Sequence, residues 1–167
     1  HNQKEPTLNN RFPKWIIVWL VCGNLLAFTD NFLFLLLRPQ TLPGGSLSFL
    51  WPHMQAYLEI DRSVQDLQNP FIWAQSLITV VEIGFGVTAL ATNLGSRAEL
   101  SYLLGFGYGL LSSFHVGLIF LVEITSGFAY LGHNSKPIIA AAYFLPNSFW
   151  IVIPLLISLH CARKLLR

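Results

Sequence analysis

Charged residues are scarce in this chain of 167 residues. Asp, Glu, Lys and Arg make up 11% of it, against roughly 25% in an ordinary soluble domain. The net charge is only +2, and no basic tract with interleaved aromatic residues occurs, so nucleic acid is not the expected partner. Because hydrophobic residues account for 53% of the chain, we expect a protein whose surface faces lipid rather than water.

Cysteine is equally sparse, and several site signatures are missing. The two cysteines, Cys22 and Cys161, lie in or beside apolar segments, so we expect buried thiols and no disulfide framework. The sequence contains no Ser-His-Asp order that supports nucleophilic catalysis, no paired-His metal spacing and no nucleotide-binding loop. We therefore expect neither a metal nor a cofactor. No stretch reads as a signal peptide, and because the first residue is His1 rather than Met, we expect a trimmed start or a tag remnant.

What the sequence does contain is a set of four long apolar runs. Each has about 20 residues, the length that crosses the hydrocarbon core of a bilayer as a helix. They predict an all-α integral membrane protein, a four-transmembrane-helix bundle with spans at residues 15–37, 71–91, 101–122 and 138–160. Residues 1–14 are then an N-terminal flank, and residues 161–167 a basic tail. In the third span we expect Gly105, Gly107 and Gly109 to permit close helix approach.

The distribution of Lys and Arg predicts the orientation. The two terminal flanks and the short second loop carry seven of these residues, and the opposite side carries three (Arg38, Arg62 and Lys136). Both termini are therefore expected in the cytosol, and the long loop at residues 38–70 in the lumen or exterior. Within that loop, "PQTLPGG" is irregular, and "FLWPHMQAYLEIDRSVQDL" has the pattern of a short amphipathic helix at the membrane interface.

Each span carries polar or small residues at helical spacing, which predicts a polar face directed into the bundle. With a rise of about 1.5 Å per residue, these residues fall in one layer, slightly lumenal of the bilayer centre. We therefore expect one polar pocket inside the bundle. Its candidate catalytic residues are Asp30, Glu82 and His115, and its candidate substrate-binding residues are Tyr108, Tyr143, Asn147 and Trp150.

Structural readings of the same residues stay open. In these readings, Asp30 or His115 has only the role of an interhelical hydrogen bond, and Asn147 only satisfies backbone groups freed by Pro146. Trp150 would then be a core-packing residue. A metal held by carboxylates and a histidine within the spans is disfavoured by their spacing. Outside the pocket we expect solvated or snorkelling side chains, namely Glu123, His133, Lys136, His53, Glu59, Asp61 and Asp66. Whether the long loop covers the pocket stays open.

The fourth span, "YFLPNSFWIVIPLLISLHCARKLL", resembles the last helix of the emopamil-binding protein family of sterol isomerases, through its Asn-x-x-Trp-x-x-x-Pro run. "LITVVEIGFG" is similar to the isomerase helix with a single central Glu, "VCGNLLAFTD" to its first-helix motif and "IFLVEITSGF" to the end of its third. The similarity extends from about Trp15 to Leu166. The wider group is the EXPERA superfamily, which includes the sigma-two receptor.

The resemblance implies specific roles. Glu82, Asn147 and Trp150 match isomerase active-site positions, and Asp30 matches a carboxylate that is Glu in the isomerase. The family carries His four residues before that carboxylate, where this chain has Leu26, so the proton-handling pair is incomplete. His115 is a candidate for the missing imidazole. The resemblance also implies a multi-pass protein of the endoplasmic reticulum membrane.

The expected function is that of a membrane-embedded isomerase or cyclase. It would act on a hydrophobic sterol- or terpenoid-type substrate from the bilayer, by protonation and stabilisation of a carbocation. The alternative is a non-catalytic protein that binds sterols or cationic amphiphiles, as the sigma-two receptor type does. A purely structural membrane protein leaves the coincident polar faces unexplained. The sequence leaves open whether the chain forms a homodimer.

Overall fold

The computed structural model describes residues 11–95 and 97–167, so the expectations for the chain start lie outside the described residues. Every regular element in the described part is helical. The predicted all-α architecture with four membrane-spanning helices is confirmed. Its spans are Lys14–Leu36, Pro70–Leu94, Ala98–Thr125 and Lys136–Leu165. The last three are longer than predicted at both ends, because helical hydrogen bonding continues past the apolar run into flanking polar residues.

The first and fourth spans are each interrupted by a π-helical segment. The first consists of α1 (Lys14–Leu26), η1 (Ala27–Leu33) and α2 (Phe34–Leu36), and the fourth of α6 (Lys136–Ile138), η4 (Ile139–Phe144) and α7 (Leu145–Leu165). In the fourth span the wider turn precedes Pro146, which has no amide hydrogen to donate to the preceding turn. In the first span the hydroxyl of Thr29 donates to the backbone carbonyl of Leu25 at the start of the π turn.

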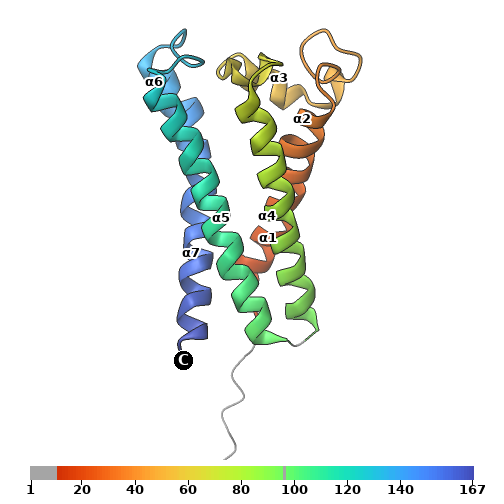
Figure 1. The fold of residues 1–167 in the computed structure, drawn as a ribbon, viewed down its shortest axis with the longest axis vertical. Helices are drawn as coiled ribbons and strands as arrows, with labels where there is room; N and C mark the ends of the chain where they lie inside the picture. Colours follow the sequence, from red (N-terminus) through yellow and green to blue (C-terminus); the bar gives the residue numbers. More distant parts are fainter. Residues whose placement is uncertain (1–10, 96) are drawn as a thin grey trace, which may run out of the picture.

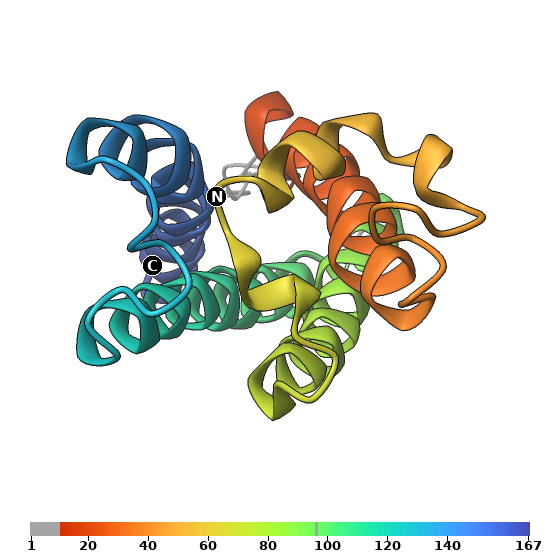
Figure 2. The same ribbon diagram turned by 90° about the horizontal axis from the view of Figure 1, so that it is seen from above.

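The four spans form a ring when viewed along the bundle (Figure 2). The third span, α5 (Ala98–Thr125), packs along both α7 and the second span, α4 (Pro70–Leu94), and the first span packs against α4. Aromatic pairs link α1 to α7, with ring centroids 5.2 Å apart for Trp19 and Trp150. The start of α1 and the end of α7 lie at the same end of the bundle, as four crossings require (Figure 1). The opposite end, formed by residues 37–69 and 126–135, is called the loop end below.

Glycines let α5 approach its neighbours. A Cβ on Gly105 would lie 2.9 Å from Sγ of Cys161, and one on Gly109 would lie against the backbone carbonyl of Pro154. A Cβ on Gly107 would lie 2.7 Å from the ring of Phe85 on α4. The expected role of these glycines in close helix approach is confirmed.

Two apolar cores stabilise the bundle, and the space between them is the site described below. The core away from the loop end joins all four spans, and its buried members include Ile16, Leu20, Ala89, Tyr102 and Ile157. The core at the loop end joins the first and second spans to the long loop, and includes Phe34, Leu35, Trp51, Leu58, Val64 and Ile72.

The long loop folds as three short helices: η2 (Ser48–Leu50), α3 (Pro52–Leu58) and η3 (Arg62–Gln65). The expected single amphipathic helix is wrong, because the backbone of Asp61 is extended and its carboxylate instead accepts a hydrogen bond from the Ser63 amide, which begins η3. The loop between α5 and α6 holds this segment. The side-chain amide of Asn134 donates to the carbonyl of Ile60 at 2.9 Å. Residues 51–65 consequently cross the loop end of the ring (Figure 2).

Candidate functional site

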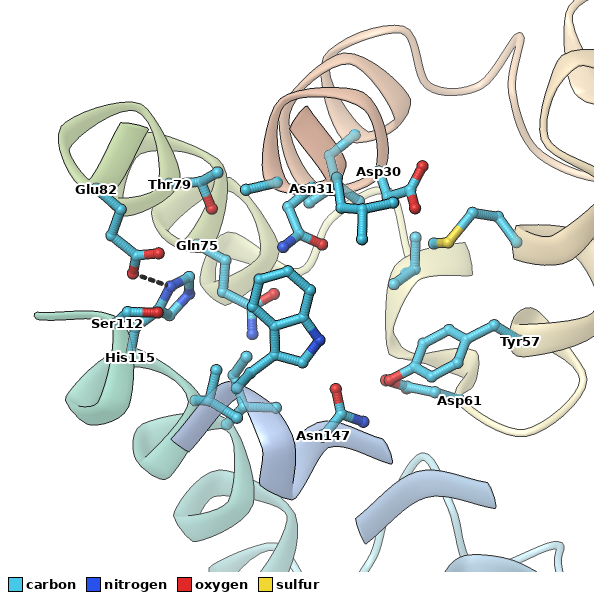
Figure 3. A pocket seen from close by; sticks show the side chains of 18 of the residues that line it. Asp30, Asn31, Tyr57, Asp61, Gln75, Thr79, Glu82, Ser112, His115 and Asn147 are labelled. Carbon is cyan, nitrogen blue, oxygen red and sulfur yellow. Dashed lines mark hydrogen bonds and ion pairs between the residues drawn. The ribbon is translucent and has the colours of Figure 1, made fainter. Parts of the chain in front are cut away.

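A cavity of about 300 Å³ lies inside the ring, bounded by the four spans and the long loop. Side chains from elements far apart in the sequence meet on its wall (Figure 3). Six of the seven residues predicted for the pocket are among them: Asp30, Glu82, Tyr108, His115, Asn147 and Trp150. The polar faces of the four spans are therefore directed at one common space.

The cavity wall is acidic. It carries three carboxyl groups, those of Asp30, Asp61 and Glu82, and one imidazole, that of His115. No Lys or Arg is among the lining residues of the described chain. Tyr57, Tyr108 and Trp150 add aromatic surface to the same wall. An aromatic and acidic lining without fixed cations favours a ligand or reaction intermediate that carries positive charge.

Glu82 and His115 are hydrogen-bonded to each other in the protein interior. Nδ1 of His115 on α5 lies 2.6 Å from Oε1 of Glu82 on α4, and both residues are buried (Figure 3). A carboxylate at this distance orients the imidazole ring. Glu82 thus orients His115 through Nδ1, and Nε2 of His115 takes no part in this hydrogen bond.

Several buried polar atoms on the cavity wall have no hydrogen-bond partner in the described structure. They are Nε2 of His115, Oγ1 of Thr79 and Oδ1 of Asn24. Asn24 approaches Gly86 on α4 so closely that a Cβ there would overlap its amide group. Since buried polar groups are normally satisfied, this part of the wall fits a polar group of a bound molecule or water.

Asp30 pairs with a histidine from the long loop. Nε2 of His53 on α3 lies 3.0 Å from Oδ2 of Asp30. His115, the candidate for the missing imidazole, is hydrogen-bonded to Glu82 on the other side of the cavity and not to Asp30 (Figure 3). Sequence reasoning treated His53 as a solvated loop residue. No local signal reveals the pairing, since it depends on where the loop folds back.

Two of the residues that the loop contributes to the inner cavity wall, Tyr57 and Asp61, are ionisable and were not predicted there. Asp61 was expected to be solvated, yet it is 4% exposed and accepts a hydrogen bond from Tyr57 at 3.4 Å. Burial raises the pKa of Asp61 above its ordinary value of 3.8, and hydrogen bonds from Ser63 oppose this shift. Burial also raises the pKa of Tyr57. The apolar residues around them, such as Leu58 and Val64, were the available sign that this stretch is buried.

Asn147 performs part of its predicted structural role. Its amide nitrogen donates to the backbone carbonyl of Tyr143 at 2.8 Å, within the turn around Pro146. The side chain nevertheless lines the cavity (Figure 3). The residue therefore stabilises the irregular backbone of the fourth span and also forms part of the wall.

Tyr143 does not reach the cavity. It was predicted to bind substrate, but it is completely buried and is not among the lining residues. Its ring is stacked on Tyr57 with centroids 6.4 Å apart, and it packs against Phe120 at 5.9 Å. The π turn of η4 carries Tyr143 behind the wall, where it supports Tyr57. Glu123 was expected at a solvated edge and is instead buried, at 3% exposure.

No cluster of three or more His, Cys, Asp or Glu side chains suited to a metal ion occurs in the described part of the chain. Comparisons of the chain with protein families, with curated proteins and with solved structures found no match. The function is therefore inferred from the cavity itself and from the sequence resemblance described above.

Proposed function

We propose that the protein is a membrane-embedded isomerase or cyclase that acts on a hydrophobic sterol- or terpenoid-type molecule. The observation that carries the proposal is the cavity between four apolar spans, whose wall holds three carboxyl groups and one imidazole but no Lys or Arg. Chemistry through a carbocation needs an acid, a base, stabilisation of positive charge and little water. The wall offers a residue for each of these tasks.

Asp30 is the acid of the proposed reaction. Its carboxyl O–H bond breaks, a C–H bond forms on one alkene carbon, and the neighbouring carbon becomes cationic. In its neutral form the carboxyl group of Asp30 carries the proton that this step needs. The carboxylate that remains after transfer then stabilises the cation, together with the ring of Trp150.

His115 is the base. The lone pair of Nε2 accepts a proton from a carbon next to the cation, and the electrons of that C–H bond form the new double bond. Glu82 stabilises the resulting imidazolium through its bond to Nδ1. One proton enters the substrate and one leaves, so the product is an isomer. Protonation of an epoxide or closure of a ring onto the cation would use the same groups.

The resemblance to sterol isomerases supports this assignment. It places Glu82, Asn147 and Trp150 at active-site positions of the family, and all three line the cavity. Leu26, which stands where the family has His, also lines it. This departure favours a substrate or reaction that differs from the family's sterol isomerisation. An orientation with both termini in the cytosol, within the endoplasmic reticulum membrane, is part of the same proposal.

The acidic wall also fits a second function, namely binding of a cationic amphiphile without any chemistry. An ammonium group would pair with Asp30 or Asp61, and its apolar part would contact the spans. This alternative predicts saturable binding of such amphiphiles together with recovery of every candidate lipid unchanged.

The test is incubation of the purified protein in lipid nanodiscs with a panel of sterols, terpenoid epoxides and polyprenylated compounds. The reactions are run in heavy water, and products are analysed by mass spectrometry against empty nanodiscs. The proposal expects an isomeric product with deuterium at the protonated carbon. A product without deuterium at a position that does not exchange would contradict the protonation mechanism. Complete recovery of all compounds, with saturable binding of an amphiphilic amine, would establish the binding function instead.

A further inference from the structure

The pair formed by Asp30 and His53 joins the interior of the bundle to its surface. The side chain of Asp30 is 19% exposed, whereas that of His53 is 60% exposed. The hydrogen bond between them measures 3.0 Å. One partner is thus largely enclosed, and the other is mostly exposed on the surface of the described structure.

Asp30 lies in the partition between two cavities. It lines the inner cavity with Glu82 and His115, and it also lines a second cavity with Leu50, Trp51 and His53. His53 itself belongs only to the second cavity. The carboxyl group of Asp30 therefore faces the proposed reaction space on one side and the imidazole of His53 on the other.

The position of His53 is defined by packing on both sides of it. Trp51, directly before α3, is buried and contacts Phe34 with ring centroids 5.8 Å apart. Leu58, at the end of α3, is completely buried. Between them, the side-chain amide of Gln55 donates to the backbone carbonyl of Thr41 at 2.9 Å. α3 is thereby held in place, so the imidazole is presented to Asp30 by a supported element.

The other titratable groups around Asp30 have different partners. The inner cavity also holds Tyr57, Asp61, Glu82, Tyr108 and His115. Tyr57 donates to Asp61, and His115 is bonded to Glu82. Within residues 11–95 and 97–167, His53 is the side chain hydrogen-bonded to Asp30. It is therefore the side chain placed to exchange a proton with Asp30 directly.

We propose that His53 is a proton-relay residue that returns a proton from the aqueous phase to Asp30 after each turnover. This inference rests on the proposed function. When Asp30 has given its proton to the substrate, the N–H bond at Nε2 of His53 breaks and the carboxyl O–H bond of Asp30 forms. A hydronium ion at the loop end then protonates the neutral imidazole that remains on His53, and the proton taken by His115 leaves to water in the emptied cavity. One proton enters and one leaves, so the cycle is balanced.

The experiment compares His53→Ala and His53→Gln with the wild-type protein in nanodiscs, on the substrate found in the panel. Ala removes the imidazole. Gln keeps a hydrogen-bond donor for Asp30 but cannot pass on a proton. Both variants are expected to lower kcat about tenfold or more, with little change in KM, since His53 lies outside the inner cavity. The matched control is Glu59→Gln, an exposed titratable residue of the same loop, which lies outside both cavities and should retain wild-type turnover.

Chemical rescue separates a relay from a structural role. Because the wild-type side chain is 60% exposed, free imidazole added to the buffer is expected to reach the vacated position and restore turnover of His53→Ala in proportion to its concentration. It should not restore Asp30→Asn, which lacks the group that receives the proton. Provided that the wild-type protein turns over substrate, either of two results would overturn the relay. One is a wild-type kcat in His53→Gln, and the other is a slow His53→Ala that imidazole does not accelerate. A wild-type protein that converts no compound would overturn the proposed function, and the relay with it.

Discussion

Nδ1 of His115 lies 2.6 Å from Oε1 of Glu82, so one hydrogen bond joins α5 to α4 inside the bundle. Neither residue has another charged partner on the described cavity wall within salt-bridge distance. The two side chains therefore orient each other. The bond orients the ring of His115, whose second nitrogen, Nε2, is buried and has no hydrogen-bond partner in the described structure.

Glu82→Gln is expected to lower turnover by about two orders of magnitude or more while the bundle remains folded. The amide oxygen still accepts the bond from His115, but a neutral group stabilises an imidazolium much less. Turnover and the unfolding transition in detergent are the measurements. Glu99→Gln, an exposed acid in the first turn of α5, is the control and should leave turnover unchanged. Wild-type turnover in Glu82→Gln would exclude the proposed base.

Gly109→Ala is expected to destabilise the protein by about 1–3 kcal/mol, because its Cβ would press on the carbonyl of Pro154 and lie 2.8 Å from Cβ of Ser158 on α7. The control on the same helix is Gly117→Ala. No heavy atom lies within 4 Å of that added Cβ, so Ala should stabilise by up to about 1 kcal/mol through helix propensity. Unfolding in a detergent titration measures both changes. Equal effects of the two substitutions would contradict the packing described for α5 and α7.

The burial of Asp61 leads us to expect that the stability of the protein depends on pH. Because burial raises its folded pKa above 3.8, the folded state binds a proton more tightly than the unfolded state. The contribution of Asp61 to stability is therefore largest below the ordinary pKa, and it falls as pH rises from about 3.8 through the folded pKa. Asp61→Asn keeps an acceptor for the Ser63 amide but cannot ionise, so it should flatten this decline. Thermal unfolding measured across this range compares the two proteins, and parallel curves would show that Asp61 does not cause the decline.

Trp150→Ala is expected to weaken the affinity for a quaternary ammonium amphiphile by roughly twofold to thirtyfold, the range for loss of a cation–π contact of about 0.5–2 kcal/mol. The substitution also removes the contact with Trp19 on α1. Phe149→Ala is the control, since that ring is 56% exposed on the same helix and is not among the lining residues. Binding is measured by titration in nanodiscs. A larger loss in Phe149→Ala would place the amphiphile on the outer surface instead.

The spans and most of the candidate site were predictable from local patterns. Apolar runs of membrane length define transmembrane helices whatever they pack against, because no other structure satisfies the backbone in hydrocarbon. Glu82 and His115 were identifiable because ionisable residues in a span face the bundle interior. Tyr143 shows the limit of this reasoning. Regular helical spacing put it on the face of Asn147, but the π turn that precedes Pro146 moved it behind the wall.

The sequence by itself determined that four helices cross a membrane and that their polar faces converge at a common depth, because both follow from length and periodicity along one chain. Only the tertiary structure decided which polar groups meet. The bond of His115 to Glu82 rather than Asp30 depends on how α5 lies against α4. The pairing of Asp30 with His53, and the burial of Asp61, depend on a loop that folds back over the bundle and is held there by long-range hydrogen bonds. These contacts join residues that are distant in sequence, so local sequence patterns do not predict them.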